Sequence, residues 1–439
     1  MHTLFYRVIV QCLLVFIRLC KKPVKRNLLY LMKTGFTLNF KPDFMNTTMR
    51  LLIGMALTFL SMHFHAGAQD TSNQPVRVAV LAPLYIDSAF NGNTYKLGNT
   101  SIPKYFIPGL DFYNGAMLAI DSLQKEHQQF AVTVFDTKKA GQTTQQLLAQ
   151  LEQEHFSLVV AAISGSAEQK LVSDFSFKTN TPVISATYPN DAGLTANPFF
   201  VMLNSSLRTH VEGLHKYMQK NHAYGKIIYL TRKGTLEEKI RSQFAAKDTS
   251  YPRLKYAVTE MPDNFTAEQL LPFLDSTKQN IIFCGSLNEA FGTNLLNILC
   301  NAPAYKATAI GMPTWDGLKA VANSNCKQVE IVYSTPFNFS RTDKTGASLS
   351  KQYRAKFMNR PSDMVFKGFE SMYHFSKLML QHRSDFINHL SDSTAHIATD
   401  FNIEPARLTN TSFVPDYLEN KKLYFIKVQA GSIKSTTTL

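Results

Sequence analysis

Residues 156–168 read FSLVVAAISGSAE, and this stretch gives the strongest indication of the fold. Its first half, Phe156–Ala162, is an apolar run of strand length, and its second half enters a predicted helix over Ala167–Lys178. A buried strand that passes through a short loop into a helix is the repeating unit of α/β proteins with parallel sheets. The loop Ser164–Ser166 follows the carboxyl end of the strand, where open α/β sheets bind ligands.

The same alternation of strand and helix patterns continues in both directions and forms two series, separated near Leu203–Arg208. The predicted strands are Val76–Leu81, Phe130–Phe135, Pro182–Ile184, Lys226–Leu230, Leu254–Val258, Ile281–Cys284, Thr308–Ile310, Ile331–Tyr333 and Lys422–Val428. The predicted helices are Gly109–Glu126, Gly141–Gln153, Thr235–Ala246, Thr266–Asp275, Glu289–Leu299, Ser348–Met358 and Pro361–His382.

Two such series predict an α/β protein of two Rossmann-like lobes, each with a mostly parallel sheet, joined by a hinge. We expect lobe 1 to comprise residues 76–203 and 335–398, and lobe 2 residues 204–334 and 399–430. The chain then crosses between the lobes three times, near Leu203–Ser206, Ser334–Phe339 and Thr399–Val414.

The N-terminal segment has the pattern of an export signal. Arg50 precedes the apolar run Leu51–Phe64, and Ala66-Gly67-Ala68 is a small-x-small cleavage site. The run is shorter than the roughly 20 residues that a membrane-spanning helix needs. We expect residues 1–68 to be an over-extended start, with Met45 or Met49 as the true first residue, plus a signal peptide cleaved after Ala68. A signal-anchor helix over Val8–Ile17 is the alternative.

The expected cleavage site has no cysteine after it, so a lipid anchor is not expected. A free exported protein stays with the cell only behind an outer membrane, which indicates the periplasm. Three cysteines follow Ala68, namely Cys284, Cys300 and Cys326, so at least one does not pair within the chain. Cys284 lies in an apolar strand run, where a buried free thiol is usual.

Composition and charge exclude several function classes. The chain of 439 residues carries a formal net charge of +14, but residues 1–68 account for +8 of it, which leaves +6 for the rest. No basic stripe with interleaved aromatic side chains indicates a nucleic-acid partner. The sequence has no nucleophile elbow, dinucleotide fingerprint, phosphate loop or zinc-protease motif. We therefore expect no enzyme, no cofactor and no metal site; His215 and His222 read as a solvated helix face.

The loops after the strands offer ligand contacts. Ser164, Gly165 and Ser166 can present hydroxyl and backbone N–H groups to a carboxylate; alternatively, Ser166 only caps the helix after a Gly165 turn. In the turn after Thr308–Ile310, Trp315 is either a pocket wall or a core residue.

An ordered series of motifs resembles one family. These motifs are PLYIDSAF, GLDFYNGAMLAIDSL, DTKKAGQTTQQLLAQL, AISGSAEQ, TPVISATYPN and FFVMLNSS. Together, over roughly residues 76–430, the chain resembles the type I periplasmic binding proteins, in particular the branched-chain amino-acid-binding group and its relatives in Bacteroidetes.

The resemblance implies where an amino acid would bind. In that family a serine loop and an Ala-Thr loop of the first lobe hold the ligand, and these positions match Ser164–Ser166 and Ala186-Thr187. A glutamate in a Gly-Pro-Glu-Gly turn of the second lobe usually receives the ammonium, but the matching turn here, Gly311–Gly317, has no glutamate. Asp316 is the substitute, unless it caps the following helix.

Three further contacts complete the expected site: Tyr85, Ser286 and Trp315. Ser286 stands where the family has aromatic residues after the strand that ends at Cys284. The expected function is that of an exported, monomeric solute-binding protein for an amino acid or related small carboxylate, with an ABC permease as partner. The alternative is a ligand sensor or cell-envelope interaction module with the same fold.

Overall fold

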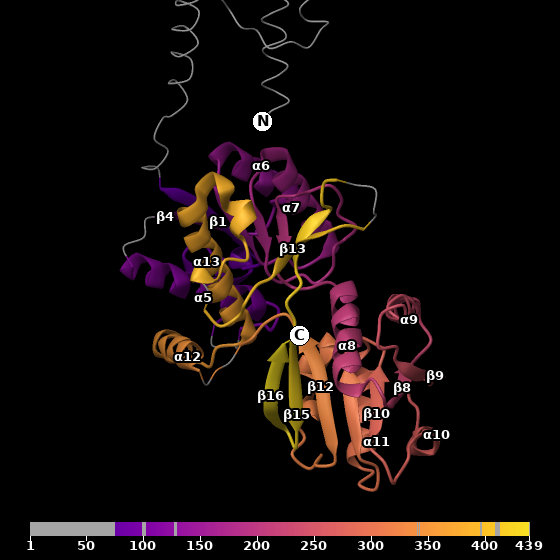
Figure 1. Ribbon diagram of the computed structural model, residues 1–439. Helices are drawn as coiled ribbons and strands as arrows, with labels where there is room; N and C mark the ends of the chain where they lie inside the picture. The colour runs from indigo at the N-terminus through magenta and orange to yellow at the C-terminus, as the bar shows by residue number, and fades with distance from the viewer. Residues whose placement is uncertain are drawn as a thin grey trace, which may run out of the picture. The chain divides into compact units, whose positions relative to one another are not determined.

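The computed structural model describes residues 75–439 except 99–101, 127–129, 340, 342, 396, 409–412 and 439. The predicted signal peptide and start, residues 1–68, lie outside the described residues. Two seven-stranded sheets, each with helices packed against it, form the described part of the chain (Figure 1). Within it, none of the helices has both the length and the apolar character needed to cross a bilayer.

The first sheet has the strand order β13-β14-β7-β6-β5-β1-β4. All its neighbours are parallel except β13 and β14, and the central strands are buried along their whole length, as in sheets covered on both faces. Its strands are β1 (Val76–Ala82), β4 (Phe130–Asp136), β5 (Leu158–Ala161), β6 (Val183–Ser185), β7 (Phe200–Met202), β13 (Ile403–Ala406) and β14 (Tyr417–Asn420). Its helices are α5 (Ile107–Lys125), α6 (Thr144–Glu154), α7 (Ser166–Thr179), α12 (Lys344–Phe357) and α13 (Asp363–His382).

Two glycines let α5 and α13 pack closely. A Cβ on Gly115 would lie 2.0 Å from the Val365 carbonyl oxygen, and one on Gly368 would lie 2.0 Å from that of Phe112. No side chain larger than hydrogen fits at either place, so the backbones of the two helices touch. This contact fixes α13, which carries a residue of the site described below.

The second sheet has the order β16-β15-β12-β11-β10-β8-β9. Strand β15 is antiparallel to both of its neighbours, β12 and β16, and all other neighbouring strands are parallel. Its strands are β8 (Lys226–Thr231), β9 (Lys255–Glu260), β10 (Asn280–Cys284), β11 (Ala307–Gly311), β12 (Val329–Thr335), β15 (Tyr424–Gln429) and β16 (Ser432–Thr438). Its helices are α8 (Leu207–His222), α9 (Thr235–Ala245), the short α10 (Ala267–Leu270) and α11 (Glu289–Cys300). Residues 86–95 form α4 (Ile86–Ala89) and a hairpin of β2 (Phe90–Asn91) and β3 (Thr94–Tyr95).

The expected lobe boundaries need one correction. We assigned all of 399–430 to the second lobe, but β13 and β14 extend the first sheet, where Leu418 pairs with Val201 of β7. The last crossing is therefore at residues 421–423, between β14 and β15, and not at Thr399–Val414. The reason is that β13, at the edge of the sheet, and β14, next to it, have only four residues each, and their polar side chains hide a strand pattern.

Of the three cysteines after Ala68, two form a disulfide and one is free. Cys300, at the end of α11, forms a disulfide with Cys326, which precedes β12. Cys284 is a buried free thiol, and burial raises its pKa to about 12. Disulfides are typical of oxidising compartments, so the Cys300–Cys326 bond agrees with an exported protein.

Candidate functional site

A cleft of about 450 Å³ lies beyond the carboxyl ends of strands from both sheets. This is the edge at which open α/β sheets bind ligands, and the volume falls in the range of small-molecule sites. The side chains that line the cleft follow β6, β7, β10, β11 and β12 or lie near the starts of α8, α9 and α13. They are residues 189–191, 204–208, 210, 236, 239, 243, 287, 313, 314, 316, 335–337, 339, 363 and 367.

Lys367 is one of the cations that line the cleft. Its ammonium lies 4.5 Å from the centroid of the Phe337 ring, and no carboxylate or hydrogen-bond acceptor among the described residues pairs with it. Asp363, one turn earlier on α13, is instead ion-paired to Arg341. Burial lowers the pKa of Lys367, and the charges of Asp363 and Asp316 oppose that shift. A half-buried ammonium without a carboxylate partner is suited to receive one from a ligand.

Asp316 faces the same cleft from the second sheet. It lies in the turn Pro313–Gly317, after β11, and has no ion pair within the described chain. Its carboxylate is open to solvent, yet the surrounding protein raises its pKa by desolvation, and the Tyr333 hydroxyl and Lys367 partly offset that effect. Of the nine site residues expected from sequence, Asp316 is the one that lines the cleft.

Other charges of both signs surround this pair. Arg208, at the start of α8, and Lys239, on α9, add positive charge, and Asp191, after β6, adds negative charge. A cleft with both signs suits a zwitterion better than a simple anion or cation.

The serine loop has an internal carboxylate. The Ser164 backbone N–H and hydroxyl both donate to Glu168 Oε2, at 3.1 and 2.7 Å, and Lys138 lies 3.7 Å from the same oxygen. The donors that were expected to hold a ligand carboxylate thus already hold one from α7. Gly165 is the N-cap of α7 without a side-chain cap, and the hydroxyl of the exposed Ser166 has no partner in the described chain.

The structure also places three of the other expected contacts outside the cleft. Thr187 Oγ1 donates to the Ile163 carbonyl at 2.7 Å, which ties the two loops together, and Ala186 is fully buried. Tyr85 packs edge-on against Tyr105, with ring centroids 5.0 Å apart.

Two of the expected second-lobe contacts, Ser286 and Trp315, are core residues. Ser286 is fully buried and donates to Glu237 Oε1 at 2.7 Å. Trp315 is also fully buried, and a Cβ on Gly311 would lie 1.9 Å from its ring. Of the two roles left open for Trp315, the structure supports core packing.

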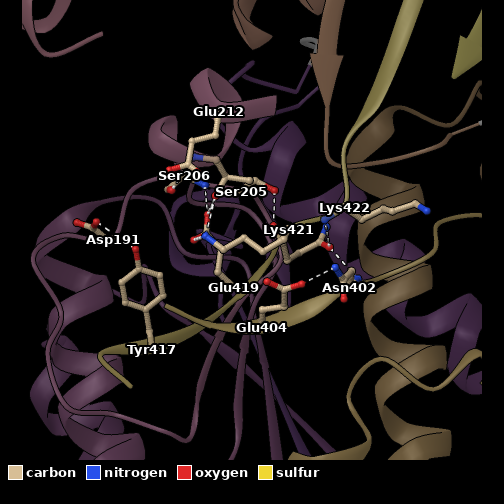
Figure 2. A network of polar contacts seen from close by, with 12 residues as sticks. Asp191, Ser205, Ser206, Glu212, Asn402, Glu404, Tyr417, Glu419, Lys421 and Lys422 are labelled. Carbon is tan, nitrogen blue, oxygen red and sulfur yellow. Dashed lines mark hydrogen bonds and ion pairs between the residues drawn. The ribbon is translucent and has the colours of Figure 1, made fainter. Parts of the chain in front are cut away.

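The hinge contains a buried polar network around Glu419. Figure 2 shows this side chain of β14 pointing at the link that leads into α8. Its Oε1 accepts hydrogen bonds from Ser206 N and Thr209 Oγ1, both at 2.7 Å, and Lys421 pairs with Oε2. Burial alone would raise the pKa of Glu419, but Lys421, Ser206 and Thr209 together lower it. One ionised carboxylate thus ties the first and last crossings together.

His210, on α8, is hydrogen-bonded to the remaining crossing, which begins at Ser334. Its Nδ1 is hydrogen-bonded to Ser334 Oγ at 2.9 Å, at the end of β12, and both residues are buried. Desolvation lowers the pKa of His210 to about 4, although the nearby charge of Glu419 opposes this shift. His210 is therefore neutral at pH 7, and its ring lines the cleft.

Sequence reasoning missed Lys367, Arg208 and the hinge network. The available signal for Lys367 was its position near the start of the predicted helix Pro361–His382, just after a predicted crossing. Its electrostatic interaction with Asp316 joins residues 51 positions apart, which one sequence does not reveal.

Comparisons with known proteins give the fold. No protein-family model and no curated protein matches the sequence. Among solved structures, a putative branched-chain amino acid ABC transporter from Rhodospirillum rubrum is similar, with a TM-score of 0.58 and 12% identity over 82% of this chain and 99% of that one. A branched chain amino acid ABC transporter periplasmic ligand-binding protein from Burkholderia xenovorans gives 0.56, with 12% identity over 83% and 95% of the two chains.

A third similar structure was solved with a ligand. It is an ABC transporter substrate-binding protein from Desulfitobacterium hafniense in complex with Leu, with a TM-score of 0.53 and 11% identity over 83% of this chain and all of that one. At these identities the likeness extends to the architecture and not to individual residues. The described chain has the fold of the type I periplasmic binding proteins.

Proposed function

We propose that this protein is an exported solute-binding protein that captures an amino acid, or a related small carboxylate, in the cleft between its two sheets for uptake by an ABC permease. The observation that carries the proposal is the pair of opposite charges in the cleft. Lys367 lies on α13, which packs against the first sheet, and Asp316 lies in the turn after β11 of the second sheet. The two side chains interact electrostatically, and neither has an ion-pair partner among the described residues. The α-carboxylate of an amino acid would pair with Lys367, and its α-ammonium would pair with Asp316.

The anchor for the carboxylate differs from the one expected from sequence. Since Glu168 occupies the donors of Ser164, Lys367 is the principal carboxylate contact in this proposal. Ser166 and the free N–H groups at the start of α7 remain a second, weaker candidate, which would need the lobes to close further to reach a ligand in the cleft. A substitution at Ser166 tests this second contact separately.

The proposed function is binding without catalysis. His210 is hydrogen-bonded to Ser334 and neutral, and no cysteine lines the cleft as described. The nearby titratable groups are balanced in charge, which suits reversible binding of a polar ligand. Export rests on the signal pattern before Gln69 and on the Cys300–Cys326 disulfide.

A thermal-shift screen tests the proposal. The purified protein is heated with single amino acids, keto acids, short peptides and sugars, each in large excess. A ligand at 100 times its Kd adds about 2.7 kcal/mol to the unfolding free energy, which raises Tm measurably. At least one amino acid or small carboxylate should do so. If no free metabolite raises Tm, the sensor or cell-envelope module becomes the better account.

Export is tested separately by the intact mass of protein from the periplasmic fraction. The expected mass corresponds to a chain that begins at Gln69. Recovery of the uncleaved chain in the inner membrane would contradict export while leaving ligand binding untouched.

A further inference from the structure

A cluster of metal-ligating side chains lies at the C-terminal end of α13, away from the cleft. His382 ends the helix, and His389 and Asp392 follow in the 3-10 turn and loop after it. One ligand atom from each of the three residues lies within 4.8 Å of the others. With a rise of about 1.5 Å per residue, His382 is about 22 Å along the helix from Lys367.

We propose that His382, His389 and Asp392 bind a divalent transition-metal cation of the zinc class. Asp392 Oδ2 is 3.2 Å from His382 Nε2 and 2.9 Å from His389 Nδ1. In a tetrahedral zinc site with bonds of about 2.0–2.1 Å, neighbouring ligand atoms are about 3.3 Å apart, and both spacings to Asp392 are within a few tenths of an ångström of that value. Two imidazoles and a carboxylate form a donor set that suits zinc.

The second nitrogen of His389 supports this assignment. Its Nε2 lies 2.9 Å from Asp385 Oδ2, and Asn388 Nδ2 donates to the other oxygen of Asp385 at 2.6 Å. Metal-binding histidines typically donate their second ring N–H to a carboxylate in this way, which fixes the tautomer and the ring orientation. Asp385 is therefore a positioning residue, which leaves Nδ1 of His389 free to bind the cation.

The backbone and the packing of the rings hold the cluster in place. The chain leaves α13 through Arg383, whose φ of +47° and ψ of −113° are unfavourable for a residue with a side chain. This turn stacks the His389 ring on that of His382, with centroids 3.7 Å apart and planes within 3° of parallel. The stack places one nitrogen of each ring beside Asp392. An imidazole binds a metal along the lone pair in its ring plane, so the two rings turn out of this parallel stack when they share one cation.

The net charge and the solvent exposure of the cluster also suit a divalent cation. With neutral imidazoles, the two aspartates give the four side chains a net charge of −2, which a divalent cation neutralises. The side chains of His382, His389 and Asp392 are 23, 33 and 38% exposed, so a cation can reach them from solvent. Three protein ligands leave the fourth position for water.

Zinc titration of the purified protein, without a polyhistidine tag and stripped with a chelator, tests the proposal. Calorimetry should show one Zn²⁺ bound per chain, and Co²⁺ should give the visible absorption of a tetrahedral nitrogen–oxygen site. His382→Ala and His389→Ala should each weaken Zn²⁺ binding at least about 100-fold. Asp385→Asn should weaken it about 10–100-fold, as for other residues that orient a ligand.

Two further variants separate loss of the metal site from non-specific binding and from misfolding. His155→Asn replaces an exposed histidine at the end of α6 and should bind Zn²⁺ as the wild type does. Asp392→Asn is nearly isosteric, so it reports on the site even where an alanine variant misfolds, which circular dichroism would reveal. Less than one Zn²⁺ per chain, or unchanged binding in Asp392→Asn and both histidine variants, would overturn the proposal. Neither result would affect the ligand site in the cleft.

Discussion

The ammonium of Lys367 lies 4.5 Å from the centre of the Phe337 ring, and its pKa is lowered by burial although Asp316 and Asp363 oppose the shift. An ammonium held over an aromatic ring gains about 0.5–2 kcal/mol but keeps its capacity to donate hydrogen bonds. Lys367 is therefore positioned and still free to bind a carboxylate.

Replacement of Lys367 by glutamine should weaken binding of the ligand found in the screen by about tenfold or more. A charge-assisted hydrogen bond contributes about 1.5–3 kcal/mol, and the amide restores only part of it. Isothermal titration calorimetry measures the change. Lys170→Gln, at an exposed position of α7, is the matched control and should bind as the wild type does. Equal affinities in all three proteins would remove Lys367 from the site.

Asp316→Asn should discriminate between ligands with and without an α-amino group. Loss of the carboxylate leaves a ligand ammonium without its partner, so affinity for the amino acid should fall while affinity for the matching deaminated acid stays the same or rises. A pair of titrations, with an amino acid and its deaminated analogue, gives the comparison. A similar loss for both ligands would mean that Asp316 has only a local structural role.

Ser166→Ala separates the two candidate carboxylate contacts. If the loop before α7 reaches the ligand when the lobes close, affinity should fall about tenfold, because one hydrogen bond to a charged group is lost. Tm of the unliganded protein should hardly change, since the Ser166 hydroxyl has no partner in the described chain. Unchanged affinity would leave Lys367 as the carboxylate contact of the first sheet.

The buried His210 should make stability fall in acid. Its pKa of about 4 in the folded protein lies below the 6.5 of the unfolded chain. Below pH 6.5 the unfolded chain therefore binds a proton that the native protein excludes, and the unfolding free energy falls until the pH reaches about 4. From pH 7.5 to 4.5 this loss amounts to about 2.5 kcal/mol.

Denaturant unfolding at pH 7.5 and 4.5 isolates the contribution of His210. His210→Asn keeps a polar group beside Ser334 but does not titrate, so it should lose about 2.5 kcal/mol less than the wild type over this range. His155→Asn, an exposed substitution, should show the loss of the wild type. Parallel losses in the wild type and His210→Asn would show that the ring is not buried as described.

Glu419 should stabilise the hinge through its charge. Glu419→Gln keeps the shape of the side chain but leaves Lys421 without its ion pair and weakens the bonds from Ser206 and Thr209. The expected cost is about 1–3 kcal/mol of unfolding free energy, measured by urea denaturation. Glu404→Gln, an exposed position in β13, is the control and should cost less than about 0.5 kcal/mol. Equal stability of the two variants would contradict the role of this network.

The fold was predictable because each strand–helix unit has its own local pattern. Phe156–Lys178 shows it best: an apolar run gives β5, a Gly/Ser loop gives the turn, and α7 follows. β14 was assigned to the wrong lobe because YLEN does not read as a buried strand, although all four residues are buried. Glu419 and Asn420 are tolerated there because each has hydrogen-bond partners that are far away in sequence.

The site was less predictable, for a related reason. Loop residues such as Ser164 have the right chemistry for a carboxylate, but the sequence does not show that Glu168, four residues later, satisfies them. Trp315 likewise has the right chemistry for a pocket wall, but Gly311 lets the ring pack into the core. Asp316 was predicted through the resemblance, because its turn matches the one that carries the family's glutamate, and this turn follows β11 at the edge of the second sheet.

Solution X-ray scattering with and without the ligand tests capture between the two sheets most directly. The crossings at residues 203–206, 334–339 and 421–423 form a hinge, and a ligand that joins Lys367 to Asp316 should draw the two sheets together. The radius of gyration should therefore fall at saturating ligand, and Lys367→Gln should need more ligand to reach the same value. A scattering profile that stays unchanged when calorimetry shows the wild type to be saturated would contradict capture in this cleft.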